Sequence, residues 1–182
     1  MSRLSIPTFE QAHAAAQPLL SAVQKQLGVL PNLMKLAGHS PAGLEGYLAL
    51  SGALAKGQLS VQLRERIALT VAEFNGCDYC LSVHSYLAAN AVKIPAREIE
   101  AARDGRSEDA RTHAALQFAR RVAESRGRVA DADLTTLRSA GFDEAAVVEI
   151  VLNVALNVLT NYLNNVAATD IDFPVVQARQ AA

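Results

Sequence analysis

The sequence has no tryptophan, only 5% aromatic residues and only two cysteines among its 182 residues. It is nevertheless 51% hydrophobic and contains many alanines. A β-sandwich would draw on aromatic and β-branched residues, whereas closely packed helices accept alanine and leucine. A chain of this length also buries a sizeable core without disulfide staples. The composition therefore favours a helical protein.

The sequence also lacks an excess of positive or negative charge, since its formal net charge is −1. Basic residues are scattered among acidic ones, and pairs such as Arg120-Arg121 are typical of solvated helix faces, so we expect no nucleic-acid partner. Residues 1–7 contain no apolar run of signal-peptide length. Residues 150–168 lack ionisable side chains, but their five asparagines fit poorly in lipid. We expect a soluble cytoplasmic protein without a membrane partner.

Caps and breaks divide the chain into helix-length pieces. Ser40-Pro41 supplies a cap and a first-turn proline, while Gly28, Gly57 and Gly141 can each end a helix. No stretch alternates like a strand, and no long linker or repeat is present. The sequence predicts an all-α fold, a single-domain bundle of about seven or eight helices over residues 1–182. The expected helices span approximately residues 9–27, 41–56, 61–74, 77–92, 95–102, 107–124, 131–139 and 143–168.

The two cysteines, Cys77 and Cys80, stand in CxxC spacing where a helix is expected to begin, and His84 follows four residues later. Two thiols at this spacing can cycle between a dithiol and a disulfide. At about 100° per residue, the three side chains fall within roughly 60° of one another around the helix axis. Unpaired amide groups and the helix dipole in the first turn favour a thiolate, and the histidine can exchange protons with it. This pattern indicates a thiol redox enzyme.

The preceding expected helix supplies a carboxylate. Glu65 shares a helix face with apolar residues such as Ala68, Leu69 and Ala72. If the two helices form an antiparallel hairpin around Gly76, Glu65 and His84 each lie about 12–13 Å from its tip, at 1.5 Å per residue. The spacing therefore predicts a Glu–His–Cys relay, although it does not fix the rotation of either helix.

These residues resemble a known family. Glu65, eleven further residues, and then Cys77-x-x-Cys80-x-x-x-His84 are similar to the signature of the alkylhydroperoxidase D-like branch of the carboxymuconolactone decarboxylase superfamily. The segments 29–33, 40–44 and 157–164 also resemble those of its peroxidase-related members. The resemblance covers nearly the whole chain, with the motif core at residues 60–92.

The resemblance implies an AhpD-like helical fold and a homo-oligomer, commonly a trimer or a hexamer. It implies that Cys80 is the peroxidatic cysteine, that Cys77 resolves it, and that Glu65 and His84 relay protons. A small hydroperoxide would be the substrate, and no cofactor is expected beyond an external thiol reductant, with lipoyl carriers and peroxiredoxin-type proteins among the candidate donors. The chain departs from the best-known members at Tyr79, where they carry a histidine; a phenol cannot act as a base near neutral pH.

Other roles for these residues stay open at the level of sequence. The CxxC pair and His84 could form part of a zinc site, with a fourth ligand drawn from Glu65, His113, His39 or His13. The two cysteines could also be purely structural. Glu73 is a rival acid to Glu65. The remaining histidines lack a partner at catalytic spacing and are expected to be surface or capping residues.

Two other functions also stay open. One is a carboxymuconolactone decarboxylase-like enzyme that acts on a ring substrate, although such decarboxylases are not built around a CxxC. The other is a redox-sensing thiol protein without significant turnover.

Asparagines recur every four residues in the last expected helix, at Asn153, Asn157, Asn161 and Asn165. The surrounding residues are mostly valine and leucine, and buried amides need hydrogen-bond partners. We therefore predict a central helix whose polar seam bonds neighbouring helices, a subunit interface or the floor of the active pocket.

Overall fold

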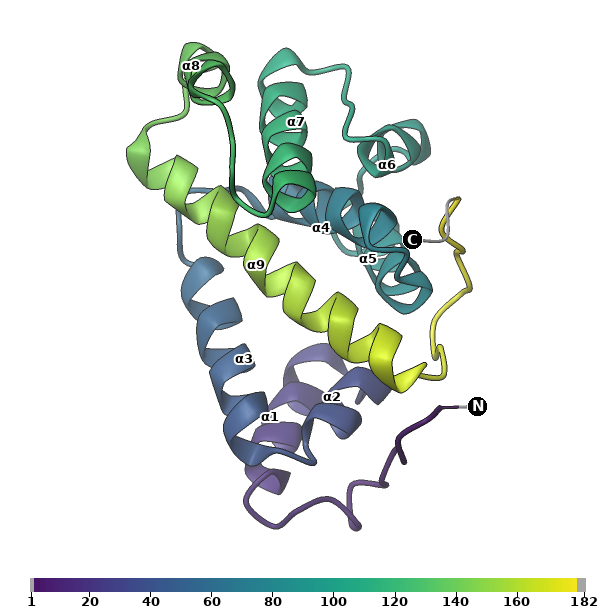
Figure 1. Cartoon of the computed structure of the whole chain (residues 1–182). Coiled ribbons are helices and arrows are strands. Elements are labelled where there is room, and N and C mark those ends of the chain that lie inside the picture. The colour runs from purple at the N-terminus through teal and green to yellow at the C-terminus, as the bar shows by residue number, and fades with distance from the viewer. Residues whose placement is uncertain (1, 180–182) are drawn as a thin grey trace.

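The computed structural model describes residues 2–179, and within them the chain forms nine α-helices and no strand (Figure 1). The predicted all-α class is confirmed. The predicted domain limits, residues 1 and 182, lie outside the described residues, and the single-domain extent stays a prediction. In chain order the helices are α1 (Gln17–Leu27), α2 (Asn32–Ala37), α3 (Pro41–Leu54), α4 (Val61–Phe74), α5 (Asp78–Asn90), α6 (Ala96–Arg103), α7 (Ala110–Ser125), α8 (Asp131–Ser139) and α9 (Glu144–Ala167).

Most helix starts follow the expected caps. The side chains of Ser40, Ser60 and Asp143 each accept a hydrogen bond from the backbone N–H three residues further on. One start differs, because Asp109 rather than Ser107 caps α7. The Ser107 hydroxyl instead donates to a glutamate of α6, so it does not accept from the helix.

Two differences from the predicted helices lie near the N-terminus. The first helix begins at Gln17 rather than near residue 9, with Pro18 in its first turn. Inside a longer helix this proline would remove a hydrogen bond and collide with the preceding turn. The second difference is α2, a six-residue helix that follows Pro31 and was not predicted. Its length is too short to show helical periodicity.

The centre of the fold is α4, which packs against α5, α6, α7 and α9. Its apolar side chains Ile67, Leu69 and Val71 are completely buried. After α4 the chain reverses at Gly76, whose φ of +60° lies in the left-handed region that favours glycine. This turn makes α4 and α5 a helical hairpin.

The long helix α9 crosses the molecule, with α3 on one side and α4, α5 and α7 on the other (Figure 1). It is the one helix of residues 2–179 long and apolar enough to span a membrane by length and composition. A central helix of a bundle has the same composition, and α9 buries Ile150, Val154 and Ala167 together with several asparagines. Its packing against four other helices accounts for its hydropathy.

The N-terminal segment and the C-terminal tail lie on the same side of the molecule (Figure 1). The Arg3 N–H donates to the Ala167 carbonyl over 2.6 Å. The C-terminal tail then runs along α5, where the Val176 N–H donates to the Ser82 hydroxyl over 2.9 Å. These contacts hold α5, the cysteine-bearing helix, between the tail and the centre of the fold.

Candidate active site

The hairpin brings together the acid and the imidazole predicted from their spacing. Glu65 on α4 and His84 on α5 are joined by a 2.8 Å contact between Oε2 and Nδ1. Their side chains are only 16% and 22% exposed, so the pair is largely shielded from water. Because Nδ1 faces the carboxylate, the other ring nitrogen remains for chemistry on the opposite side.

Both cysteines are free thiols and lie at the start of α5. Cys77 is the N-cap residue, and its Sγ accepts a hydrogen bond from the Cys80 N–H over 3.4 Å. Cys77 is fully buried and Cys80 is 2% exposed. Both sulfurs therefore lie at the helix start where the sequence predicts a thiolate, and both are almost completely shielded from solvent.

The two thiols differ in acidity. A hydrogen bond from the Cys77 thiol, the charge of His84 and hydrogen bonds from asparagines outweigh burial and lower the pKa of Cys80 to about 7. The same hydrogen bond, together with burial, raises the pKa of Cys77 far above its ordinary value. The site therefore contains one thiol that ionises at neutral pH and one that remains protonated.

The imidazole takes part in this charge arrangement. Burial lowers the pKa of His84, but the Glu65 carboxylate and the Cys80 thiolate together outweigh burial, so the pKa lies above its usual value. Within the described chain no hydrogen bond joins His84 directly to Cys80. The three groups are coupled through their charges.

Sequence reasoning missed the most direct partner of Cys80. Asn164 on α9 donates from Nδ2 to Cys80 Sγ over 3.3 Å. The predicted seam passed through Asn165, but that residue is exposed and its amide instead bonds the Asn75 carbonyl over 2.9 Å. A four-residue step turns 40° further than a whole helical turn, so the buried face shifts to position 164 after Asn161.

The predicted seam therefore has two halves. Asn161 bonds the Asn75 side chain over 2.8 Å, so the C-terminal half holds the tip of the α4–α5 hairpin and the floor of the site. The amides of Asn153 and Asn157 donate only to carbonyls of α9 itself. The predicted bonding to neighbouring helices thus applies to the C-terminal half alone.

Tyr79 stands where the best-known alkylhydroperoxidases of this type carry a histidine, and its side chain links distant parts of the fold. Its hydroxyl accepts a hydrogen bond from the Leu33 N–H over 3.0 Å and donates to Asp172 Oδ1 over 2.9 Å. Burial raises the pKa of Tyr79 well above its usual value. The residue ties α5 to α2 and to the C-terminal tail, and its phenol remains protonated at neutral pH.

The rival acid Glu73 lies elsewhere. Its carboxylate accepts from the buried Arg103 guanidinium over 2.6 Å and from the Arg179 N–H over 2.6 Å. The exposed His13 and His39 bond nearby groups of the N-terminal segment. No group of three or more histidine, cysteine or acidic side chains is arranged to hold a metal ion within residues 2–179.

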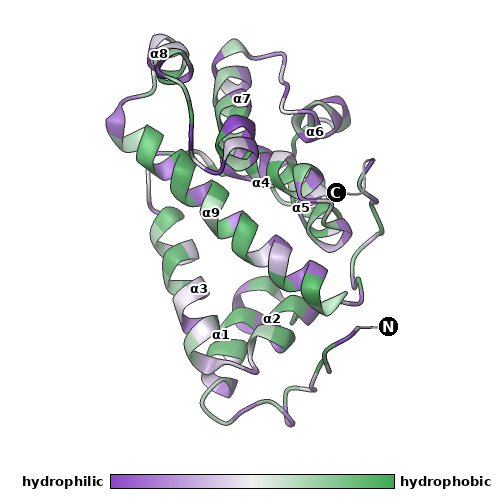
Figure 2. Cartoon of the chain, in the orientation of Figure 1, coloured by the Kyte–Doolittle hydropathy of each residue, from purple (hydrophilic) through white to green (hydrophobic). Residues whose placement is uncertain are grey.

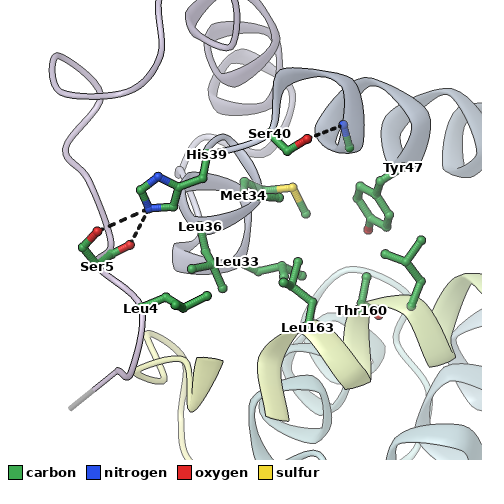
Figure 3. A pocket seen from close by; sticks show the side chains of 13 residues that line it. Leu4, Ser5, Leu33, Met34, Leu36, His39, Ser40, Tyr47, Thr160 and Leu163 are labelled. Carbon is green, nitrogen blue, oxygen red and sulfur yellow. Dashed lines mark hydrogen bonds between the residues drawn. The ribbon is translucent and has the colours of Figure 1, made fainter. Parts of the chain in front are cut away.

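A cavity of about 610 Å³ lies between the N-terminal segment, α2, α3 and α9 (Figure 3). Its walls are mainly apolar, with five leucines and one methionine among the lining residues, and at its rim His39 Nε2 contacts the Ser5 carbonyl over 2.8 Å. The residues that line it are Leu4, Ser5, Leu33, Met34, Leu36, Ala37, His39, Ser40, Gly43, Tyr47, Leu159, Thr160 and Leu163.

One wall of this cavity adjoins the cysteine site. Thr160 lines it and shares a helix face with Asn164, the partner of Cys80. Tyr47 lines it as well, and burial together with the nearby charges of Cys80 and Glu65 raises the pKa of Tyr47 to about 12. Neither sulfur is itself among the lining atoms of the described cavity, so a side chain must move for a molecule in the cavity to reach Cys80.

Comparison with known proteins agrees with this architecture. The model of the carboxymuconolactone decarboxylase family matches residues 41–125. No curated protein matches the chain. A solved structure titled as an alkylhydroperoxidase AhpD core, an uncharacterized peroxidase-related protein from Ralstonia eutropha JMP134, is 24% identical, with a TM-score of 0.84 over 94% of this chain and 92% of that one.

Two further solved structures share the fold. An uncharacterized peroxidase-related protein from Silicibacter sp. TM1040 is 26% identical, with a TM-score of 0.81 over 93% of this chain and 91% of that one. The debrominase Bmp8, in complex with 2,3,4-tribromopyrrole, is 22% identical, with a TM-score of 0.73 over 87% of this chain and 86% of that one. The segment that the family model matches contains Glu65, Cys77, Cys80 and His84, and the chain shares the fold of the alkylhydroperoxidase AhpD core and of the peroxidase-related proteins.

Proposed function

We propose that the protein is a thiol-dependent hydroperoxide reductase that uses Cys80 as its peroxidatic cysteine and Cys77 as its resolving cysteine. The observation that carries the proposal is the placement of two free thiols at the start of α5, where Asn164 donates to Cys80 Sγ over 3.3 Å and Cys77 Sγ accepts from the Cys80 N–H over 3.4 Å. The lowered pKa of Cys80 and the raised pKa of Cys77 agree with this placement. A nucleophilic thiolate beside a protonated thiol suits a reaction that ends in a disulfide. The Glu65–His84 pair supplies the accompanying acid–base function.

The proposed reaction begins with proton transfer from the Cys80 thiol to His84, whose imidazolium is stabilised by Glu65. The thiolate attacks the terminal oxygen of R–O–O–H, so that an S–O bond forms and the O–O bond breaks. The departing alkoxide takes the proton from His84 and leaves as an alcohol, while the sulfur is oxidised by two electrons to a sulfenic acid. Cys77 then attacks this sulfur, and the sulfenic oxygen leaves as water with the Cys77 proton.

A disulfide between Cys77 and Cys80 completes the oxidised state, and an external dithiol restores the two thiols by exchange. A lipoyl carrier or a peroxiredoxin-type protein is the class of donor that we propose, with no bound cofactor. We place the reaction in the cytoplasm, where such donors keep thiols reduced.

The apolar cavity supports a hydroperoxide with a bulky apolar group. Leucine and methionine walls favour a hydrocarbon over a small polar molecule, since burial of apolar surface stabilises binding by about 25 cal/mol per Å². Tyr47 lies on the wall that adjoins Cys80. We therefore propose that this side chain moves to admit the O–OH group while the apolar part stays in the cavity.

Anaerobic thiol counting tests the proposal. One equivalent of cumene hydroperoxide should convert both thiols of the wild-type protein into one disulfide, and a lipoyl or thioredoxin-type donor should sustain turnover. Cys80→Ser should abolish consumption of the peroxide, whereas Cys77→Ser should leave a trapped sulfenic acid. Reversible oxidation without turnover by any donor would instead support a redox-sensing protein, and unchanged peroxide consumption by Cys80→Ser would refute the mechanism.

A further inference from the structure

Two asparagines of α9 face Cys80 with hydrogen-bonding groups that have no partner. Asn164 uses Nδ2 to bond Cys80 Sγ, and its Oδ1 is buried without a partner in residues 2–179. Asn161 uses Oδ1 to accept from the Asn75 side chain, and its Nδ2 is likewise buried and unpartnered in the described structure. The two residues are 2% and 0% exposed. Buried polar groups are nearly always hydrogen-bonded, so one free acceptor and one free donor near a reactive sulfur indicate a missing ligand.

The chain holds these amides in place from both sides. Asn75 lies two residues before Cys77 at the tip of the hairpin, and it receives a bond from Asn165 as well as bonding Asn161. Because the Asn161 oxygen is already occupied by Asn75, its Nδ2 is the end that remains available. The orientation is therefore set before any substrate arrives, as preorganised stabilisation of a transition state requires.

We propose that Asn161 and Asn164 form an amide cradle that binds the oxygen transferred from a hydroperoxide to Cys80. The proposal rests on the proposed peroxidase function. Before reaction, Asn164 Nδ2 stabilises the Cys80 thiolate. When the S–O bond forms and the O–O bond breaks, the oxygen on sulfur accepts from Asn161 Nδ2. The hydroxyl proton of the resulting sulfenic acid donates to Asn164 Oδ1. Each unpartnered group thereby gains its partner in the oxidised intermediate.

The acidity of the sulfur agrees with this geometry. After the Cys77 hydrogen bond and the charge of His84, the nearby amides of Asn164 and Asn161 also help to lower the pKa of Cys80. Substitution of either asparagine leaves in place the titratable groups that interact with Cys80. These are Cys77 at the N-cap of α5, Tyr79 and His84 on α5 and Tyr47 on α3, together with Glu65 on α4, which acts through His84. A change in the sulfur is then attributable to the amide.

The first measurement is the pH midpoint of Cys80 alkylation by iodoacetamide, followed by mass spectrometry. Asn164→Ala should raise this midpoint by roughly one pH unit, which is a loss of thiolate of roughly fivefold at pH 7. Asn157→Ala is the matched control, because this buried asparagine of the same helix bonds only the Asn153 carbonyl. It should leave the midpoint unchanged. An unchanged midpoint in Asn164→Ala would overturn the role of its amide.

The second measurement uses the Cys77→Ser background, in which the sulfenic acid cannot resolve. Asn161→Ala should shorten the lifetime of the sulfenic acid by roughly tenfold, as scored by dimedone capture after one equivalent of cumene hydroperoxide, because it removes a donor to the bound oxygen. The Asn157→Ala control should keep the lifetime of the parent. Equal lifetimes in the Asn161 and Asn157 variants would overturn the cradle.

Failure of the cradle and failure of the peroxidase function give different results. If the wild-type protein consumes no hydroperoxide, the function fails, while alkylation still reports on Asn164 without any peroxide. If Asn164→Ala does not fold, Asn164→Asp keeps the shape and replaces the donor by a negatively charged acceptor. It should raise the Cys80 midpoint further than the loss of the donor alone. A midpoint at or below that of the wild type would overturn the proposal.

Discussion

The two faces of α9 carry opposite chemistry. The face toward α4 and α5 buries Asn153, Asn157, Asn161 and Asn164. The opposite face exposes large apolar side chains, with exposed fractions from 38% to 65%, at Val148, Leu152, Leu159, Tyr162 and Val166. A surface helix ordinarily buries its apolar stripe and exposes its polar one. On α9 the buried face instead carries four amides beside Ile150 and Val154, while the exposed face is apolar.

The spacing of the outer face supports a helical partner. Five of the six large apolar residues that α9 exposes, all except Val151, follow one another at intervals of four, seven, three and four residues, as in the heptad repeat of a helix that packs against another helix. The neighbouring α3 is also predominantly apolar but buries only Leu44 and Leu54 (Figure 2). We propose that these two helices form the interface of the homo-oligomer that the family resemblance implies.

The largest effect is expected at the site that borders the inner face of α9, the face that carries the buried asparagines. There Glu65 of α4 holds His84 of α5. Glu65→Gln removes the negative charge that keeps the imidazolium stable, so peroxide consumption should fall by about 10²–10⁴-fold, the usual contribution of acid–base catalysis. The rate of cumene hydroperoxide loss measures it. Glu73→Gln is the control, because Glu73 bonds Arg103 and the C-terminal tail instead. It should lower thermal stability and leave turnover near that of the wild type. Equal losses of turnover in the two variants would show that the relay has been misassigned.

Charged substitutions on the outer face of α9 should lower the oligomeric mass of the protein. Val166→Lys, combined with Tyr162→Lys, places two charges on the exposed apolar stripe and should convert the oligomer to smaller species, as measured by light scattering. Val175→Lys is a matched control, since Val175 and Val166 are both 65% exposed and Val175 lies in the C-terminal tail. A wild-type protein that is already monomeric, or an oligomer that tolerates both charges, would contradict the interface.

The acidity of Cys80 predicts how the rate of its reaction with peroxide depends on pH. Its pKa of about 7 lies below the ordinary value for cysteine, so the thiolate fraction rises as pH increases through 7 and falls about tenfold per unit below it. Cys77 does not contribute, because its pKa is raised. The initial rate of the single-turnover reaction with peroxide should therefore rise through pH 7 and then level. A midpoint at the ordinary cysteine value would mean that the surroundings do not stabilise the thiolate.

Local signals in the sequence predicted much of the fold, because caps, prolines and glycines determine where helices begin and end. The range of α4 was predicted at 61–74 and is found there. Spacing along two helices also placed Glu65 level with His84. The short α2 could not be predicted in the same way, because six residues cannot display a helical period.

The rest of the site depends on contacts between distant segments. The bond from Tyr79 to Asp172 spans 93 residues, and that from Asn164 to Cys80 spans 84. No local pattern encodes such partners, and the rotation of each helix about its axis decides which asparagine meets the sulfur. A period of 3.6 rather than four residues would have directed attention to Asn164.

The smallest effect is expected at the N-terminal end of the inner face of α9, where Glu149 precedes the buried asparagines. The test is whether Glu149 stabilises the fold without affecting the cysteine site. The Glu149 carboxylate accepts from the backbone N–H groups of Gln58 and Leu59 over 2.8 and 3.1 Å, and so holds the loop between α3 and α4. A Cβ at Gly57 would lie 2.5 Å from this carboxylate. Gly57→Ala should therefore push this flexible carboxylate aside and lower the free energy of unfolding by about 0.5–1.5 kcal/mol, the usual net contribution of a hydrogen bond.

Gly52→Ala serves as the control in chemical denaturation, because a Cβ at Gly52 meets nothing within 4 Å. In the helix interior this substitution should leave stability unchanged or raise it by up to about 1 kcal/mol. The Cys80 alkylation midpoint should be unaffected in both variants, since Glu149 lies just over four helical turns, about 22 Å, before Asn164 along α9. A shifted midpoint in Gly57→Ala would mean that the two halves of the inner face act as one unit. A stability equal to that of Gly52→Ala would mean that Glu149 does not hold the loop.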